Sequence, residues 1–202
     1  MPPQWEPLPY LTSEPDTWRE LFFEVKTARG VAALLEVDYR HLVWMVYGNR
    51  DSYYDDFSIP KRRGGERQIS APRGSLKLLQ GKLASILGAV YLRKPPVHGF
   101  VRDRSILTNA RSHSRSQFVL NIDLVDFFPS IHFGRVRGLF SKKPYYRPSD
   151  AATALAAICC YQDALPQGAA TSPVTANMIC GQLDSQLLRL AAAHDCTYTR
   201  IR

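Results

Sequence analysis

Two adjacent glycines, Gly64 and Gly65, separate two short runs with the residue types of extended strands, within residues 57–72. Glycine adopts the backbone conformations that a tight turn requires, so a Gly-Gly pair between two such runs predicts a β-hairpin. Four basic residues surround the turn, namely Lys61, Arg62, Arg63 and Arg67. A hairpin tip with this charge could clamp a polyphosphate through bidentate arginine contacts. The alternative is an ordinary solvated surface turn.

Most of the remaining sequence has apolar residues at helical spacing. The segment from Trp18 to Val46 predicts two or three helices with a break at Gly30, and residues 76–87 predict an amphipathic helix. Further helices are predicted over residues 105–113, 133–142, 150–162 and 174–193. Strands are predicted at the apolar, partly β-branched residues 118–122, which we expect to be buried, and at residues 197–201. The sequence therefore predicts an α/β (α+β) fold that is mostly helical, with a small antiparallel sheet.

The overall charge is compatible with a polyanionic partner. Lysine and arginine number 26 against 18 aspartates and glutamates, a formal net charge of +8, and nucleic acid is the usual partner of such a chain. The four cysteines form no C-x-x-C pair, which favours buried reduced thiols over a zinc site. The N-terminus lacks the pattern of a signal peptide, and the longest apolar run, residues 151–161, is too short to span a bilayer. We therefore expect a soluble, cytoplasmic protein with no membrane partner.

An acidic residue, Asp123, directly follows the predicted strand at residues 118–122. A carboxylate at the end of a buried strand is costly unless a partner compensates its charge, and a divalent cation is one such partner. The alternative is a helix cap, formed either by Asp123 or by the nearby Asp126.

The loop at residues 165–173 contains Gly168 and Pro173, which indicate a fixed turn leading into a helix. Small residues on such a turn let another backbone or a base approach closely, and the amides at a helix N-terminus favour anions. The alternative is an ordinary loop in which Ser172 caps the helix and Pro173 lies in its first turn.

Three of these segments resemble motifs of reverse transcriptases, and they occur along the chain in the same order as in that family. Residues 119–131 are similar to the first metal-binding motif, residues 165–173 resemble the next motif, which shapes the nucleotide and template site, and residues 59–72 resemble the fingers hairpin. Residues 97–113 look like the stretch, with its Asn-Ala-x-x-His signature at Asn109 to His113, that marks retron reverse transcriptases. The resemblance covers roughly residues 20–200, with an intron-type or diversity-generating polymerase as the nearest alternative.

The family implies a right-hand polymerase with three parts. These are an N-terminal helical region at residues 1–50, fingers with the basic hairpin at 51–117, and a partial palm at 118–202 without a thumb. It implies an RNA-directed DNA polymerase that copies a structured non-coding RNA template-primer into cDNA from deoxynucleotides, in some cases with a defence effector protein. The competing hypothesis is a non-catalytic RNA-binding module derived from that family, which would bind through the hairpin and residues 102–115.

The resemblance also implies roles for individual residues. Asp123 would bridge two magnesium ions (Mg2+), with the carbonyl of Ile122 or Leu124 as a further ligand. By the same resemblance, Lys61 and Arg67 would contact the triphosphate, and Phe128 would lie against the deoxyribose. Gln167 and Gly168 would lie near the nucleotide and the template base. The residues expected to contact RNA are Arg62, Arg63, Asn109 and His113. A structural, hydrogen-bonded histidine is the alternative for His113, and a core position is the alternative for Phe128.

The sequence departs from the family pattern at its C-terminal end. Residues 198–200 are similar to the strand that leads into a further motif, a tight turn with paired aspartates, and Arg202 stands where that turn would begin. Two clustered magnesium ions need several carboxylates. We therefore expect that this 202-residue chain cannot polymerise DNA by itself.

Overall fold

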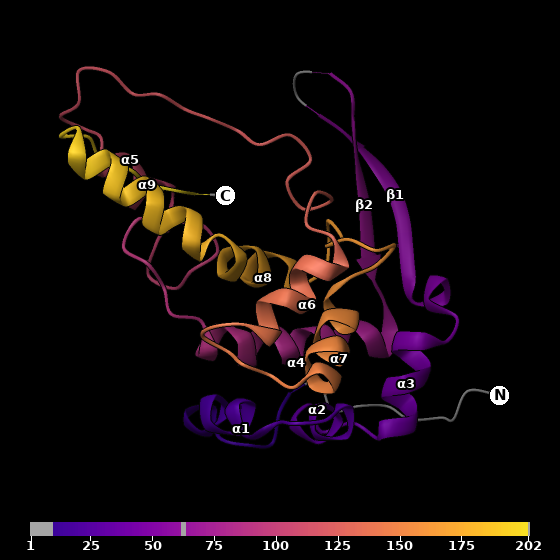
Figure 1. Ribbon diagram of the computed structural model, residues 1–202. Coiled ribbons are helices and arrows are strands. Elements are labelled where there is room, and N and C mark those ends of the chain that lie inside the picture. The colour runs from indigo at the N-terminus through magenta and orange to yellow at the C-terminus, as the bar shows by residue number, and fades with distance from the viewer. Residues whose placement is uncertain (1–9, 62–63, 202) are drawn as a thin grey trace. The chain divides into compact units, whose positions relative to one another are not determined.

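The computed structural model of the chain describes residues 10–61 and 64–201 and contains two compact units (Figure 1). The first unit comprises Met1–Val90 and Asp126–Thr175, and the second comprises Tyr91–Val125 and Ala176–Arg202. The described chain is mostly helical with one two-stranded antiparallel sheet, which confirms the predicted fold class. In the described part of the chain, no helix is both long and apolar enough to cross a membrane.

Helices form the body of the first unit. They are η1 (Pro15–Thr17), α1 (Trp18–Glu24), α2 (Ala28–Leu34), α3 (Tyr39–Tyr47), η2 (Arg50–Tyr53), α4 (Gly74–Val90), α6 (Phe133–Ser141) and α7 (Ser149–Cys159). Side chains cap two of them in the expected way, since Thr27 accepts a hydrogen bond from the Gly30 amide and Asp38 accepts from the Arg40 amide. The predicted amphipathic helix is confirmed as α4, whose leucine and isoleucine stripe is buried.

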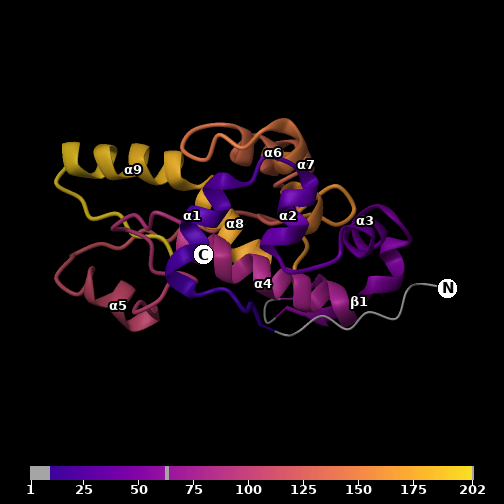
Figure 2. The ribbon, with the colours of Figure 1, turned by 90° about the horizontal axis from the view of Figure 1, so that it is seen from below.

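The core of the first unit lies among α1, α2, α4, α6 and α7, and Figure 2 shows α1 in front of α4. Arg147 stabilises one edge of this core. Its Nη1 donates to the carbonyls of Phe22 at 3.2 Å and Val25 at 3.0 Å, as well as to that of Phe23, and its Nε donates to the Tyr145 carbonyl at 2.8 Å. The carbonyls of Phe22, Phe23 and Val25 lie at the C-terminal end of α1, where helical partners are lacking. One guanidinium therefore ties α1 to the loop that precedes α7.

The predicted hairpin is confirmed. Strands β1 (Tyr54–Pro60) and β2 (Glu66–Pro72) are antiparallel, with Phe57 opposite Ile69, and the hairpin extends away from the helices of its unit (Figure 1). Gly64 and Gly65 both have positive φ, at 87° and 78°, which is the conformation that made glycine informative in the sequence.

Aromatic stacking anchors the base of the hairpin to the helices. The rings of Tyr54 and Tyr161 stack with centroids 3.8 Å apart. Gln80 on α4 donates to the Tyr54 hydroxyl at 2.9 Å, and the Tyr161 hydroxyl donates to Asp51 at 2.9 Å. Burial raises the pKa of Tyr161 to about 12, so its hydroxyl keeps its proton at neutral pH.

The second unit contains two helices of its own and the end of a third. These are α5 (Ile106–Arg111), α9 (Gly181–Ala193) and the C-terminal part of α8 (Thr171–Ile179), which begins in the first unit. The prediction of one continuous helix over residues 174–193 is wrong, because α8 and α9 are separated at Cys180. Gly181, which follows the break, has a low helix propensity, and this accounts for the interruption.

The prediction of a buried strand at residues 118–122 is also wrong for this chain. The side chains of Phe118, Leu120 and Ile122 are 91%, 84% and 79% exposed, and the segment has no strand structure. A buried strand needs neighbouring strands to pair with and a layer of side chains to cover it. Among the described residues the only two strands, β1 and β2, pair with each other. The apolar composition was read correctly, but the surroundings that would bury it are absent from the described chain.

A buried thiol makes the stability of the first unit sensitive to alkaline pH. Cys159 on α7 is fully buried and accepts a hydrogen bond from the Thr175 hydroxyl at 3.7 Å. Burial raises its pKa from 9.0 to about 11. Because the folded pKa lies above the unfolded one, this stabilisation is complete below pH 9 and is lost as the pH rises toward 11, a loss on the order of 2–3 kcal/mol.

We therefore expect Cys159→Ala to lower the free energy of unfolding at pH 7.5 but to flatten its decline between pH 8.5 and pH 10.5, by about 1 kcal/mol or more over that range. Urea denaturation in the presence of a reductant measures this slope. Cys196→Ala, which removes an exposed thiol, is the control and should leave the slope unchanged. Equal slopes for all three proteins would contradict the assignment.

Candidate functional site

The glutamine loop, residues 165–173, is fixed directly against the hairpin within the first unit. The Ser70 amide on β2 donates to the Gln167 carbonyl at 2.8 Å. Gly168 has φ 125°, and a Cβ at this position would lie 3.0 Å from the Ser70 carbonyl oxygen and 3.1 Å from the Ile69 Cγ2. A side chain would therefore be strained in φ and would also push the strand away. The expectation that small residues here admit a second backbone is confirmed, and that backbone is β2.

The loop is further tightened by Ser172, whose hydroxyl donates to the Pro166 carbonyl at 2.6 Å. The expected capping role of Ser172 is wrong, because α8 already begins at Thr171. At its other end the loop is tied to the turn that holds Phe128. The Leu165 amide donates to the Ile131 carbonyl at 3.0 Å, and the Ile131 amide donates to the Phe128 carbonyl at 3.0 Å. Hairpin, glutamine loop and Phe128 turn are thus connected by hydrogen bonds.

The described cations of the hairpin are unengaged. Lys61 and Arg67 are exposed, and neither forms an ion pair with a described residue. The Lys61 amide donates to the Gly65 carbonyl at 2.9 Å, which fixes the backbone at the tip, and Arg67 lies opposite Ile59 in the register. Both side chains can therefore meet an anion without first breaking a contact. Arg62 and Arg63 lie outside the described residues.

Phe128 is half-buried in a turn, with its ring 5.9 Å from that of Phe127. Both phenylalanines are half-buried, so Phe128 is not a fully buried core residue.

Asp123 belongs to the second unit, whereas the hairpin, the glutamine loop and Phe128 belong to the first. Its carboxylate is exposed and has no hydrogen-bond or ion-pair partner among the described residues. Ile122 and Leu124 beside it are 79% and 55% exposed, and their carbonyls accept no hydrogen bond from a described residue. The Asp123 carboxylate and the carbonyls of Ile122 and Leu124 are oxygen ligands of the kind that a hard cation prefers.

One carboxylate does not complete a two-metal site. Within residues 10–61 and 64–201, the structure contains no group of three or more histidine, cysteine, aspartate or glutamate side chains placed to hold a metal ion. The donor set around Asp123 therefore does not fit a pair of bound magnesium ions by itself.

The two signature residues Asn109 and His113 face inward to a common partner. His113 Nε2 lies 2.7 Å from the Thr199 hydroxyl, which in turn donates to the Asn109 side-chain oxygen. Asn109 and His113 thus make hydrogen-bonding contacts inside the chain. For His113 this agrees with the alternative of a structural, hydrogen-bonded histidine. They attach α5 and the turn after it to the segment at residues 197–201.

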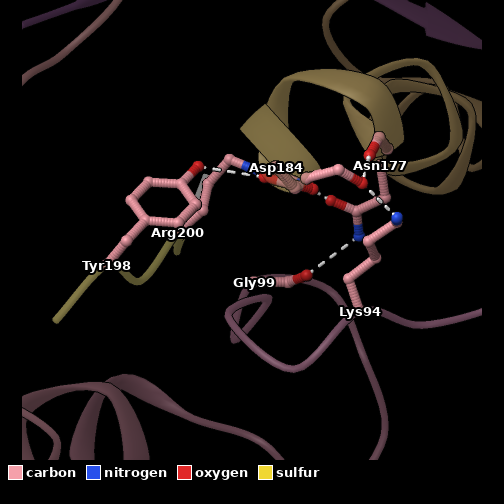
Figure 3. A network of polar contacts seen from close by, with 8 residues as sticks. Lys94, Gly99, Asn177, Asp184, Tyr198 and Arg200 are labelled. Atoms are coloured by element: carbon pink, nitrogen blue, oxygen red, sulfur yellow. Dashed lines mark hydrogen bonds and ion pairs between the residues drawn. The ribbon is translucent and has the colours of Figure 1, made fainter. Parts of the chain in front are cut away.

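A buried ion pair holds that same segment in place (Figure 3). Arg200 contacts both carboxylate oxygens of Asp184 on α9 at 2.8 Å, and its third nitrogen donates to the Asn177 side-chain oxygen at 2.8 Å. The Tyr198 hydroxyl donates to the same carboxylate at 2.9 Å, and Asn177 donates to the Gly99 carbonyl at 3.0 Å. The Arg200 backbone pairs with residues 96–98.

The charges of this network are well compensated. Burial acts to lower the pKa of Arg200, but the hydrogen bonds and negative charge of Asp184 outweigh it and raise that pKa. Burial and the Asp184 charge both raise the pKa of Tyr198. The pairing was not predictable from the sequence, because the residue types of Asp184 and Arg200 do not identify each other as partners. The signals in the sequence were a charged residue in the predicted helix at residues 174–193, another in the predicted strand at residues 197–201, and the resemblance of Asn177 and Asp184 to positions that follow the motif at residues 165–173.

Comparison with known proteins adds a family match. The sequence model of a family described as reverse transcriptase (RNA-dependent DNA polymerase) matches residues 59–200. The chain is 37% identical to the Retron Mx65 reverse transcriptase of Myxococcus xanthus over 196 residues, covering 87% of this chain and 45% of the relative. It is 34% identical to the Retron Mx162 enzyme of the same organism, covering 88% of this chain and 40% of the relative. With the Retron Ec86 reverse transcriptase of Escherichia coli it shares 38% identity, over 74% of this chain and 47% of the relative. The chain spans less than half the length of each of these relatives.

Proposed function

The chain belongs to the reverse transcriptase family and is of the retron type, and from that premise we propose that it forms the fingers and the front part of the palm of an RNA-directed DNA polymerase. The observation that carries the proposal is the docking of the glutamine loop on a hairpin with unengaged cations. Both segments occur in the order of the family's motifs, and the family match extends over them.

The proposed substrates are an RNA template-primer and deoxynucleotides, and the proposed product is cDNA. The names of the relatives, which are retron reverse transcriptases, support an RNA template. That this RNA is structured and non-coding is proposed from the resemblance to the family. Magnesium is the proposed metal, the cytoplasm the proposed compartment, and a defence effector protein a further proposed partner, all by resemblance to the family. A pair of magnesium ions needs several carboxylates, and the described residues hold no such group. We therefore propose that the chain is inactive by itself.

In this proposal the residues of the first unit receive the nucleotide. Lys61 and Arg67 contact the triphosphate, since both are exposed cations at the tip of a fixed hairpin. Phe128 lies against the sugar, and Gln167 with Gly168 lies near the nucleotide and the template base. Asp123 supplies one oxygen ligand to a metal ion, and the carbonyls of Ile122 and Leu124 are candidates for another.

A non-catalytic RNA-binding module is the second candidate function. The incomplete set of metal ligands among the described residues favours it, as do three exposed arginines of the second unit, Arg102, Arg111 and Arg115. Since Asn109 and His113 are engaged with Thr199, these arginines are better placed for RNA contacts than the two signature residues. Such binding would weaken steeply with salt.

The test is primer extension on an RNA template with magnesium, using two proteins. One is the chain alone, and the other is a chimera in which the chain replaces the matching segment of the Retron Mx65 reverse transcriptase. We expect extension by the chimera only. In the chimera, Lys61→Ala and Arg67→Ala should each raise the KM for deoxynucleotides about tenfold, because each removes one charge-assisted phosphate contact.

The matched control is Lys77→Ala, which removes an exposed cation of the same unit on α4, outside the hairpin. It should leave the KM unchanged. An inactive chimera that still binds RNA with steep salt dependence would support the RNA-binding module instead. Equal KM values for Lys61→Ala, Arg67→Ala and Lys77→Ala would refute the role of the hairpin.

A further inference from the structure

Helix α3 exposes an aromatic face that the proposed polymerase function does not use. Its opposite face is core, with Leu42, Met45 and Val46 only 2% exposed, whereas Trp44 and Tyr47 are 48% and 57% exposed. Residues three and four apart lie on one side of a helix, and here they line a shallow groove of about 330 Å³. The groove is lined by Tyr39, Arg40, Val43, Trp44, Tyr47 and Gly48.

The chemistry of the groove favours proline rather than a polyanion. Three of its six lining residues are aromatic and none is acidic. Arg40 is the one cation among the six lining residues. Arg29 lies over the Tyr39 ring at 4.4 Å, and Arg50, which is near Tyr47, already donates to the Ala157 carbonyl at 2.9 Å. A nucleic acid needs a row of cations along its backbone. Ridges of tyrosine and tryptophan, by contrast, are the surfaces on which extended proline-rich segments dock.

The chain has such a segment at its N-terminus, immediately before the described residues. The first nine residues, MPPQWEPLP, contain four prolines, a tryptophan and one glutamate. The prolines and the tryptophan match the rings of the groove, and Glu6 matches the charge of Arg40. Proline-rich sequence also loses little conformational entropy on docking, because its backbone is already restricted.

The described residues that directly follow this segment are tied to a residue close to the start of α3. The amides of Thr12 and Ser13 donate to the Glu36 carboxylate at 2.8 Å and 3.0 Å, and Glu36 lies two residues before Asp38, which caps α3. Nine residues in polyproline II conformation reach about 28 Å, whereas the nine residues of α3 span about 14 Å. The first nine residues can therefore follow the whole groove from this attachment.

We propose that residues 1–9 dock in cis into the aromatic groove of α3, which is thus an internal binding site for a proline-rich segment. The attachment of Thr12 and Ser13 to Glu36 makes the docking intramolecular, so even a weak intrinsic affinity gives high occupancy. This inference concerns the first unit alone and holds whether or not the chain is part of a polymerase.

The test uses the full chain with Leu8→p-benzoylphenylalanine, which leaves the prolines and Trp5 in place. On irradiation we expect a monomeric cross-linked product, and after trypsin digestion mass spectrometry should find residues 1–19 joined to residues 41–50. Adding Trp44→Ala or Tyr47→Ala should lower the cross-link yield about fivefold or more, because buried aromatic anchors dominate such contacts. Pro7→Gly together with Pro9→Gly should lower it as well.

Phe57→Ala is the matched control, since Phe57 is a 49% exposed aromatic residue of the same unit outside the groove. It should leave the yield unchanged. Unfolding temperatures of all variants serve as the folding check, and little change is expected because the substituted side chains are exposed. A cross-linked dimer would assign the groove to a second copy and overturn docking in cis. Cross-links that avoid α3, or a yield insensitive to Trp44, would overturn the proposal altogether.

Discussion

Asp123→Ala should abolish primer extension by the chimera without unfolding it. The carboxylate is exposed and has no partner among the described residues, so its loss should change the free energy of unfolding by less than about 0.5 kcal/mol. Loss of an outer-shell partner of a metal ligand already costs about 10- to 100-fold in activity, and a direct ligand should cost more. We therefore expect a decrease of more than about 100-fold in the single-turnover rate.

The matched control is Asp195→Asn, which neutralises another exposed carboxylate of the second unit at a position with positive φ, where asparagine is well tolerated. It should retain the rate of the unsubstituted chimera. RNA binding by Asp123→Ala, measured in parallel, should also be retained. A rate for Asp123→Ala within a factor of a few of the control would sink the assignment of Asp123 as a metal ligand.

Arg200→Met should destabilise the second unit by about 3–5 kcal/mol, because it leaves the Asp184 carboxylate buried with most of its compensation gone. Asp184→Leu should cost a similar amount. The double variant should recover much of this loss, since a buried ion pair replaced by apolar residues of similar volume is close to neutral. Urea denaturation followed by circular dichroism measures all three values as a double-mutant cycle.

The chain provides an exposed ion pair as the comparison. Arg73 lies 2.9 Å from Asp55 on the hairpin, and both side chains are more than half exposed. Arg73→Met should cost less than about 1 kcal/mol, because water already screens the pair. If Arg200→Met proved no more destabilising than Arg73→Met, the buried pair would not hold the segment at residues 197–201.

Local signals predicted the parts of the fold that local interactions determine. The turn at Gly64 and Gly65 requires positive φ, a conformation that glycine adopts without steric strain. The hairpin was predictable for that reason. The stripe of α4 follows from helical periodicity. The run at residues 118–122 shows the limit of such signals. Its composition is that of a buried strand, but burial depends on neighbouring strands, which a local pattern does not supply.

The candidate site also has features that local sequence signals predict and features that depend on the fold. Gly168 was predictable, because a glycine in a turn beside another backbone has a steric reason that residue type alone conveys. The partners of Asn109 and His113 were not, because Thr199 is 86 residues away from His113 and only the fold brings them together. The pairing of Asp184 with Arg200 likewise depends on where α9 ends and how the chain returns. The grouping into fingers and palm stays a prediction.

The exposed run at residues 118–125 has a consequence for how this chain behaves while it is being made. A stretch with Phe118, Leu120 and Ile122 open to water is the kind of sequence that chaperones hold and that neighbouring molecules join edge to edge at high concentration. During synthesis it would leave the ribosome well before residues 197–201. We therefore expect the yield of native protein to decrease as the concentration of the newly made chain rises.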